Sequence, residues 1–156
     1  MSATATTTVD EPTDDAHPEA ALADAERRPR TRAGTLESIE QARLAAEAAL
    51  DRQAVDLKVL ELAGVSDFTD YFLICTGNNE RQVQAIADAI EKSLRDAKVK
   101  PLHIEGKSGA RWVLLDYGGD MVVHVFRDEA RSFYDLERLW SDAPDVTDQL
   151  VEGAAG

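Results

Sequence analysis

Few residues of this chain have the types and spacing that catalysis requires. Gly106-Lys107-Ser108 resembles the end of a phosphate-binding loop, but that loop needs a glycine five positions before Gly106, where Pro101 stands. No two aspartates lie at Asp-x-Asp spacing, so a two-metal site for phosphoryl transfer has no evident ligands. The His-Glu-x-x-His and Gly-x-Ser-x-Gly motifs are also absent from the sequence. The pattern favours a binding surface over a reaction.

Two isolated side chains could still carry chemistry. His124 lies between two valines, and we expect a packed histidine with one satisfied ring nitrogen; an interface contact is the alternative. Cys75, the single cysteine, lies in an apolar run and is expected to be a small buried hydrophobe, because nothing near it in sequence would lower its pKa. One cysteine excludes an internal disulfide and favours a reducing compartment.

The aromatic residues are stronger candidates, because Trp, Tyr and Arg dominate the energetic centres of interfaces. Trp112 opens a strand directly after Arg111, so we expect it at an edge that a partner can reach. Trp140 falls on a helical stripe, where a core position is favoured and an interface position is the alternative. Asp116 interrupts an apolar strand near its end, and a structural charge at the rim or a functional acid would both explain it.

Composition limits the partners. The chain has 156 residues and a net charge of −13, from 30 acidic and 17 basic residues. This balance disfavours direct contact with nucleic acid, whose affinity depends on cations that neutralise phosphates, and favours a basic protein. No apolar run approaches the ~20 residues of a membrane helix, and no secretory signal is visible, so we expect no membrane contact and a cytoplasmic location.

The hydrophobic patterns predict one α/β domain at residues 35–142. Residues 1–34 are poor in large apolar side chains, so we expect a disordered N-terminal tail, and 143–156 are expected to be a C-terminal tail. The basic patch at 27–32 is expected to be a solvated linker, with a weak contact to ribosomal RNA or another polyanion as the alternative.

Periodicity indicates the elements between these tails. Helices are expected at 35–52, capped by Thr35, after Asn78 or Asn79 with a stripe of apolar residues to Leu94, and at about 129–140 with Phe133 on the buried face. The expected strands are 55–59, 71–76, 101–105, 112–117 and 121–126. This order implies a mixed five-stranded sheet with flanking helices. Three helices would cover five strands thinly, which would leave part of one face for a partner.

The turn at Gly118-Gly119 decides which residues Trp112 meets. A two-residue loop would pair Tyr117 with Asp120 and place Trp112 opposite Val125. A three-residue loop of Tyr117, Gly118 and Gly119 would instead place Trp112 directly across from His124, on the same face. The sequence permits both.

Five motifs in order resemble the Iojap or ribosomal silencing factor (RsfS) family, over about residues 36–141. The motifs are Ser66-Asp67-Phe68-Thr69-Asp70-Tyr71-Phe72-Leu73-Ile74-Cys75-Thr76-Gly77, Glu80-Arg81-Gln82-Val83, His103-Ile104-Glu105-Gly106, Trp112-Val113-Leu114-Leu115-Asp116-Tyr117-Gly118 with Val123-His124-Val125-Phe126, and Arg131-Ser132-Phe133-Tyr134-Asp135-Leu136-Glu137-Arg138-Leu139-Trp140. Two features depart from the family pattern. The turn has an additional glycine, which leaves the hairpin register open, and the N-terminal segment extends beyond the family core. We favour the three-residue loop, which keeps Trp112 paired with His124.

The resemblance implies a fold related to nucleotidyltransferases without their catalytic residues, and hence no enzyme and no cofactor. It implies a factor that docks on the large ribosomal subunit at large-subunit ribosomal protein fourteen, blocks joining with the small subunit, and lowers translation under nutrient limitation. Carried over by position, the partner surface comprises Trp112, Asp116, His124, Tyr134, Leu136 and Trp140, with Glu105 and Gly106 as additions. The alternatives are a nucleotide-binding or nucleotidyltransferase-type enzyme, suggested by fold kinship alone, and a homodimer that hides the same surface.

Overall fold

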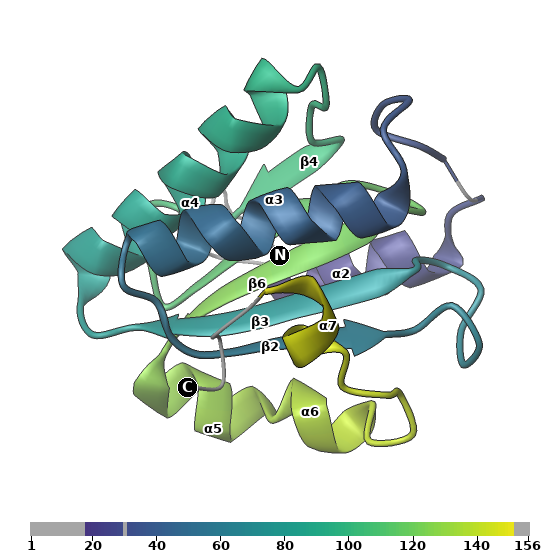
Figure 1. Cartoon of the computed structure of the whole chain (residues 1–156). Helices are drawn as coiled ribbons and strands as arrows, with labels where there is room; N and C mark the ends of the chain where they lie inside the picture. The colour runs from purple at the N-terminus through teal and green to yellow at the C-terminus, as the bar shows by residue number, and fades with distance from the viewer. Residues whose placement is uncertain (1–17, 30, 152–156) are drawn as a thin grey trace, which may run out of the picture.

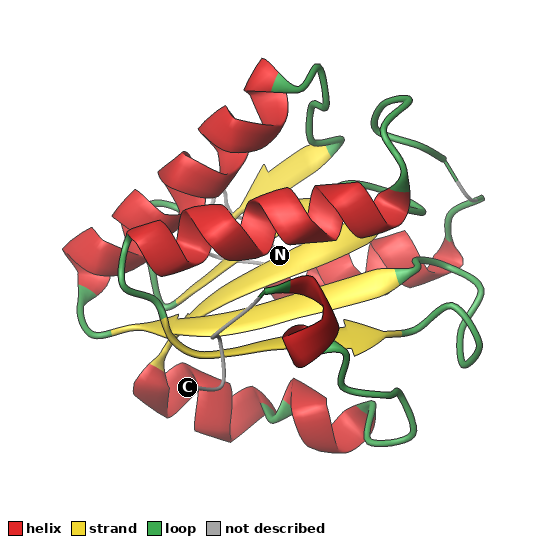
Figure 2. Cartoon of the chain, in the orientation of Figure 1, coloured by secondary structure: helices red, strands yellow, loops and turns green. Residues whose placement is uncertain are grey.

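The apolar runs of the sequence form a mixed five-stranded sheet with the strand order β2-β3-β6-β5-β4. The computed structural model describes residues 18–29 and 31–151, so the expectation for residues 1–17 lies outside it. Strands β3 and β6 run parallel and the other neighbouring pairs are antiparallel, as a sheet that combines a helical crossover with hairpins requires (Figure 2). The strands are β2 (Val55–Glu61), β3 (Tyr71–Gly77), β4 (His103–Glu105), β5 (Trp112–Asp116) and β6 (Met121–Arg127).

Helices cover both faces of this sheet. Figure 1 shows α3 and α4 on one side and α5 and α6 on the other, and each side has its own apolar core. The described helices are α2 (Pro18–Arg27), α3 (Ser38–Asp51), α4 (Glu80–Asp96), α5 (Asp128–Tyr134), α6 (Leu136–Leu139) and α7 (Thr147–Leu150). The predicted α/β class and mixed sheet are confirmed.

Helix α4 follows its sequence signals closely. The side chain of Asn79 caps the helix by accepting a hydrogen bond of 2.8 Å from the backbone N–H of Gln82. The amide oxygen of Gln82 in turn accepts from the backbone N–H of Asn78 at 2.6 Å, one residue earlier than in a standard capping box. The predicted buried stripe is confirmed, since Val83, Ile86, Ile90 and Leu94 are all fully buried.

Two helix predictions need correction. Helix α3 begins after Glu37, so Thr35 is not its cap, and Ile39 is exposed while small alanines and Gln41 are buried. The last predicted helix is broken into α5 and α6 by Asp135, which has a left-handed conformation at φ 50°. Because this break rotates the chain, Phe133 faces solvent and not the core.

The C-terminal segment is part of the fold, although we expected a tail from residue 143. Val146, Leu150 and Val151 are buried in the core under α3. The backbone N–H of Val146 donates a hydrogen bond of 2.8 Å to the carbonyl of Val59, which anchors the segment beside β2. The tail prediction was wrong because it rested on the polar composition of the segment, whereas three apolar residues within it are enough to anchor it in the core.

The N-terminal segment is also more ordered than its composition indicates. Helix α2 buries Ala21, Leu22 and Ala25 in the core that contains Trp112. Two arginines of the basic patch are bound to the domain and are not part of a free linker: Arg28 pairs with Asp116, and Arg32 pairs with Asp120 at 3.2 Å. The prediction of disorder at 18–34 was wrong for α2, because even a few small apolar side chains gain stability when they pack on an apolar sheet.

The β5–β6 hairpin adopts neither of the two expected registers. Tyr117 lies opposite Met121, so the loop comprises Gly118, Gly119 and Asp120, and Trp112 pairs with Phe126. The loop therefore has three residues, but it is shifted one position along the chain. Because a shift of two pairing positions preserves the side-chain face, Trp112 and His124 still share one side of the sheet.

Candidate partner-binding surface

Alternation along β5 and β6 separates the sheet into two faces with different chemistry. One face carries aliphatic side chains and is covered by α3 and α4. The other carries Trp112, Leu114, His124 and Phe126 and is covered by α2, α5 and α6; we call it the aromatic face. Successive side chains of a strand point to opposite faces, which places every second residue of β5 and β6 on the aromatic face.

Ring contacts run without a gap across the aromatic face. Trp140 contacts Phe72 with ring centroids 5.7 Å apart, and Phe72 contacts His124 at 4.6 Å. His124 contacts Trp112 at 5.9 Å, and Trp112 contacts Tyr134 at 4.5 Å. The structure thus brings four of the eight predicted site residues, Trp112, His124, Tyr134 and Trp140, into one connected set of rings.

His124 is a fully buried histidine, as its preferred interpretation predicted. Its Nδ1 accepts a hydrogen bond of 3.1 Å from Nε1 of Trp112, which assigns the ring proton to Nε2. Nε2 is buried without a hydrogen-bond partner among the described residues. Burial lowers the pKa of His124 to about 3, because the charged imidazolium would lose its hydration. His124 therefore holds the Trp112 indole through this hydrogen bond and is not itself at the surface.

Trp112 is not at an open edge, and this corrects our expectation. Its side chain is only 3% exposed, since it lies on Phe126 and beneath Tyr134 and α2. A small cavity of about 130 Å³ opens beside it, lined by Pro18, Glu19, Gly106, Gly109, Arg111, Trp112 and Tyr134. The N-terminal helix α2 and Tyr134 together cover the indole.

The α5–α6 residues lie along the rim of the aromatic face. Tyr134 is half-buried, and its hydroxyl lies 3.4 Å from a carboxylate oxygen of Glu19. Leu136 is buried, while Trp140 is half-buried with its Nε1 lacking a partner among the described residues. Arg131 fixes the broken helix, because its guanidinium binds Glu137 at 2.8 Å and the Thr76 hydroxyl of β3 at 2.8 Å.

The remaining predicted residues lie on the other half of the face. Asp116 is buried at the end of β5, where Oδ1 accepts from the backbone N–H of Gly118 at 2.8 Å and Oδ2 binds Arg28. Glu105 lies on edge strand β4 with a carboxylate oxygen 2.5 Å from the His103 ring. Gly106 has φ 91°, and a Cβ there would lie 2.0 Å from the Trp112 carbonyl oxygen, so only glycine fits.

Sequence reasoning missed three residues of consequence. Phe133 and Leu139 are 77% and 69% exposed on α5 and α6, the largest exposures among the large hydrophobic side chains of the described residues. The only sequence signal for a break between these two residues was Asp135, an aspartate inside an otherwise helical pattern. Asp120 is the third: its buried carboxylate holds Gln41 at 3.0 Å and Arg32 at 3.2 Å, which ties α3 and the N-terminal segment to the hairpin turn.

Three further properties of the described residues concern metal ligands, the reactivity of the thiol and membrane-spanning helices. Within residues 18–29 and 31–151, no group of three or more His, Cys, Asp or Glu side chains is placed to hold a metal ion. Burial raises the pKa of the Cys75 thiol to about 12, which keeps it protonated and unreactive. None of the helices in this part of the chain is both long and apolar enough to cross a bilayer.

The structure defines a small mixed α/β domain whose five-stranded sheet carries a buried aromatic cluster on one face. Residues 35–155 match the family described as "Ribosomal silencing factor during starvation". The chain belongs to this ribosomal silencing factor family, RsfS.

Relatives and solved structures agree with this membership. Ribosomal silencing factor RsfS of Bacillus subtilis (strain 168) is 48% identical over 102 residues, which are 65% of this chain and 86% of that protein. A crystal structure of a Chromobacterium violaceum protein superimposes with a TM-score of 0.66 at 35% identity, covering 68% of this chain and 88% of that one. Mouse "Mitochondrial assembly of ribosomal large subunit protein 1" is 33% identical over 105 residues, 65% of this chain and 45% of that protein.

Proposed function

We propose that this protein binds the large ribosomal subunit through its aromatic face and α5–α6, and that its bulk prevents the small subunit from joining. The protein represses translation in this way under nutrient limitation, in the cytoplasm, and transforms no substrate. Family membership supports action on the ribosome, and the name of the mouse relative refers to the large subunit.

One observation carries the choice of surface: exposed Phe133 and Leu139 flank the ring cluster of Trp112, Tyr134 and Trp140. Large apolar side chains are unfavourable in water, and burying them in an interface contributes free energy to binding. Tyr134 links the two sets, because its ring contacts both Phe133 at 5.0 Å and Trp112 at 4.5 Å.

Charge supports a protein partner over RNA. With a net charge of −13, the chain is attracted to basic proteins and repelled by phosphates. Large-subunit ribosomal protein fourteen, which the family resemblance implies, is the partner we propose. Long-range attraction would speed the encounter and the apolar contacts would supply affinity, so binding should weaken as salt rises.

Two measurements with purified subunits test this function. Sedimentation of the protein with separated large or small subunits should recover it with the large subunit alone. Light scattering of mixed subunits should show less joining as the protein is added. Full joining at protein concentrations that saturate the large subunit would refute the steric mechanism. The homodimer stays a prediction, which light scattering of the protein alone at several concentrations tests.

A further inference from the structure

We infer that α2 is a displaceable cover over the aromatic face, and that it imitates and competes with the partner segment that docks there. This inference rests on the proposed function. Residues 18–34 lie outside the family match, which begins at residue 35. They nevertheless occupy the part of the sheet that the three predicted core helices leave open.

The contacts of α2 include the residues that the proposed function needs. Ala21, Leu22 and Ala25 pack into the core that contains Trp112 and Phe126, while Pro18 lines the cavity next to Trp112 and Tyr134. The chain just beyond α2 places Arg28 on the buried carboxylate of Asp116. As long as α2 is seated, neither Trp112 nor Asp116 can contact another protein.

The chemistry of the cover indicates the chemistry of the partner. Helix α2 presents small apolar side chains to the rings, and the following residues present a guanidinium to Asp116. A basic protein segment with small apolar residues beside an arginine or lysine would make the same contacts. A buried carboxylate strongly favours a cation over water, so Asp116 would pass from Arg28 to the basic residue of the partner.

The cover is built to be displaced. Helix α2 has ten residues, and an isolated helix of this length is marginal in water. Its apolar contacts come from alanines, one leucine and one proline, which bury little area per residue. The Arg28 side chain is 39% exposed, so water and salt weaken its ion pair with Asp116.

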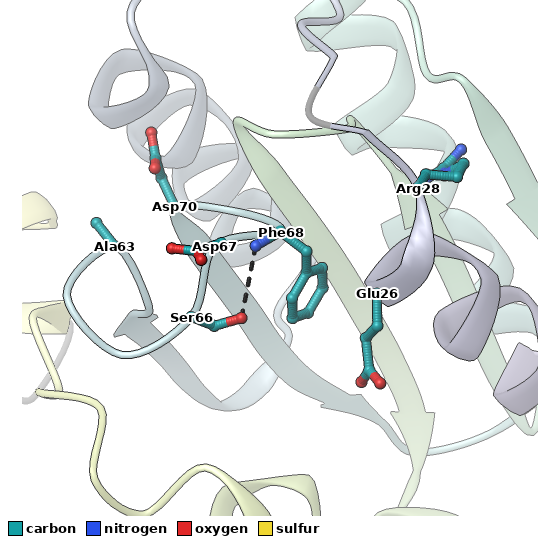
Figure 3. A pocket seen from close by; sticks show the side chains of 7 residues that line it. All are labelled: Glu26, Arg28, Ala63, Ser66, Asp67, Phe68 and Asp70. Carbon is teal, nitrogen blue, oxygen red and sulfur yellow. Dashed lines mark hydrogen bonds between the residues drawn. The ribbon is translucent and has the colours of Figure 1, made fainter.

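A hollow separates the end of α2 from the β2–β3 loop. Its volume is about 550 Å³, and Figure 3 shows Glu26 and Arg28 on the α2 side of it and Ser66 and Phe68 on the loop side. The C-terminal end of α2 therefore lacks lateral packing on this side. The cover rests on the sheet without being enclosed by it.

A short strap keeps a displaced α2 attached to the domain. The backbone N–H of Gly119 donates to the carbonyl of Thr31 at 2.5 Å, and Arg32 binds Asp120 at 3.2 Å. A Cβ on Gly118 would lie 2.2 Å from the Thr31 oxygen. Only a glycine at this turn position therefore lets the strap, residues 31–33, pack so closely. The additional turn glycine and the N-terminal extension, both departures from the family pattern, thus lie in direct contact.

The test uses the same substitution at two positions of α2 in the full chain. Ala25→Glu places a charge in the buried contact, whereas Ala20→Glu places it on the exposed side of the helix. Acrylamide quenching is measured in a Trp140→Phe background, where Trp112 is the only tryptophan, and reports whether Trp112 becomes accessible. Sedimentation of the variants that retain Trp140 with purified large subunits reports affinity. We expect Ala25→Glu to increase quenching and to bind about tenfold more tightly, because a larger fraction of molecules is competent to bind. Ala20→Glu should match the unmodified chain in both.

A second pair of variants avoids any buried substitution. Arg28→Glu removes the ion pair with Asp116, while Arg27→Glu changes an arginine that pairs with Asp24 on the same helix. Arg28→Glu should also raise quenching and affinity. Arg27→Glu makes the same charge change away from Asp116, where it removes only an exposed i,i+3 pair, so it should change both much less. This pair decides the question if Ala25→Glu unfolds the domain.

The outcomes separate the cover from the proposed function. Higher quenching with higher affinity supports the cover. Higher quenching with unchanged or lower affinity overturns it, because α2 would then be structural or part of the docking surface. Unchanged quenching in both Ala25→Glu and Arg28→Glu shows that α2 is not displaceable and also overturns it. If the unmodified chain and every variant fail to sediment with large subunits, the proposed function fails and the competition inference falls with it, whatever the quenching shows.

Discussion

Nε1 of Trp112 donates a hydrogen bond of 3.1 Å to Nδ1 of His124 inside the sheet, between residues that are diagonal neighbours and not direct partners. The bond joins two of the residues that the family resemblance marks for partner binding, yet both side chains are buried. While α2 is seated, the two side chains can act on a partner only indirectly, by supporting the face from which Tyr134 and Phe133 reach the surface. In the proposed complex Trp112 would contact the partner directly only after α2 is displaced.

Acid should destabilise the protein through His124. Burial lowers the pKa of the folded imidazole to about 3 from an ordinary value of 6.5. Between these values the unfolded chain takes up a proton that the folded chain does not, so stability falls as pH decreases from about 6.5 towards 3, by at most about 1.4 kcal/mol per pH unit. Urea unfolding at pH 7 and pH 5 measures this slope.

The matched variants for this prediction are His124→Gln and His103→Gln. His124→Gln keeps an acceptor for the Trp112 N–H but cannot be protonated, so its stability should depend less on pH in this window. His103 lies at the exposed sheet edge, and His103→Gln is the control for the loss of a surface histidine. Equal slopes in all three proteins would contradict the assignment.

Trp112→Phe should reduce the free energy of unfolding by about 1–3 kcal/mol, because Nδ1 of His124 would be buried without a donor. Trp140→Phe is the control, since Nε1 of Trp140 has no hydrogen-bond partner among the described residues and its removal breaks no bond. Urea unfolding midpoints compare the two. A larger loss for Trp140→Phe would mean that ring size, and not the hydrogen bond, dominates. Trp112→Ala should cost more, about 3–5 kcal/mol, and cannot serve as a simple surface variant.

Gly118→Ala should loosen the N-terminal strap. Gly118 has φ 69°, and an added Cβ would meet the Thr31 carbonyl, so we expect a loss of about 1–2 kcal/mol and faster amide exchange at residues 31–33. Gly64→Ala adds the same methyl group where no atom lies within 4 Å and should change neither quantity. Hydrogen-exchange mass spectrometry makes the comparison; unchanged exchange in Gly118→Ala would exclude the turn as the anchor of the strap.

Phe133→Ala should weaken binding to the large subunit by about 1–2 kcal/mol without changing the thermal midpoint, because the side chain is exposed in the free protein. Ile39→Ala is the control, on α3 at the opposite side of the sheet, where Ile39 is 40% exposed. Sedimentation with purified large subunits measures both. Equal affinities for the two variants would remove α5 from the docking surface.

Local signals in the sequence were sufficient for much of the fold. The apolar run of β3 and the stripe of α4 are each dictated by neighbours within a few residues, so alternation, helical periodicity and a capping asparagine predicted them correctly. The face shared by Trp112 and His124 was also predicted, because both three-residue loops preserve the same parity along the strands. The exact hairpin register was not, because the two adjacent glycines allow more than one loop and the turn packs against Thr31, a residue far away in the sequence.

The exposure of Phe133 and the burial of Trp112 lay beyond any local pattern. Phe133 faces solvent because Asp135 takes a left-handed conformation that Arg131 stabilises from across the break. Trp112 is buried because α2, a segment whose composition predicts disorder, finds an apolar sheet to lie on.

The sequence by itself therefore determined the α/β class and the strands, because these follow from local periodicity. It also determined the family and the set of aromatic residues, because contiguous sequence motifs carry them. Only the tertiary structure decided which of those aromatics reach the surface and which lie under the N-terminal helix. Accessibility depends on contacts between segments far apart in the chain, and the energy of such contacts is a property of the assembled sheet and not of any one segment.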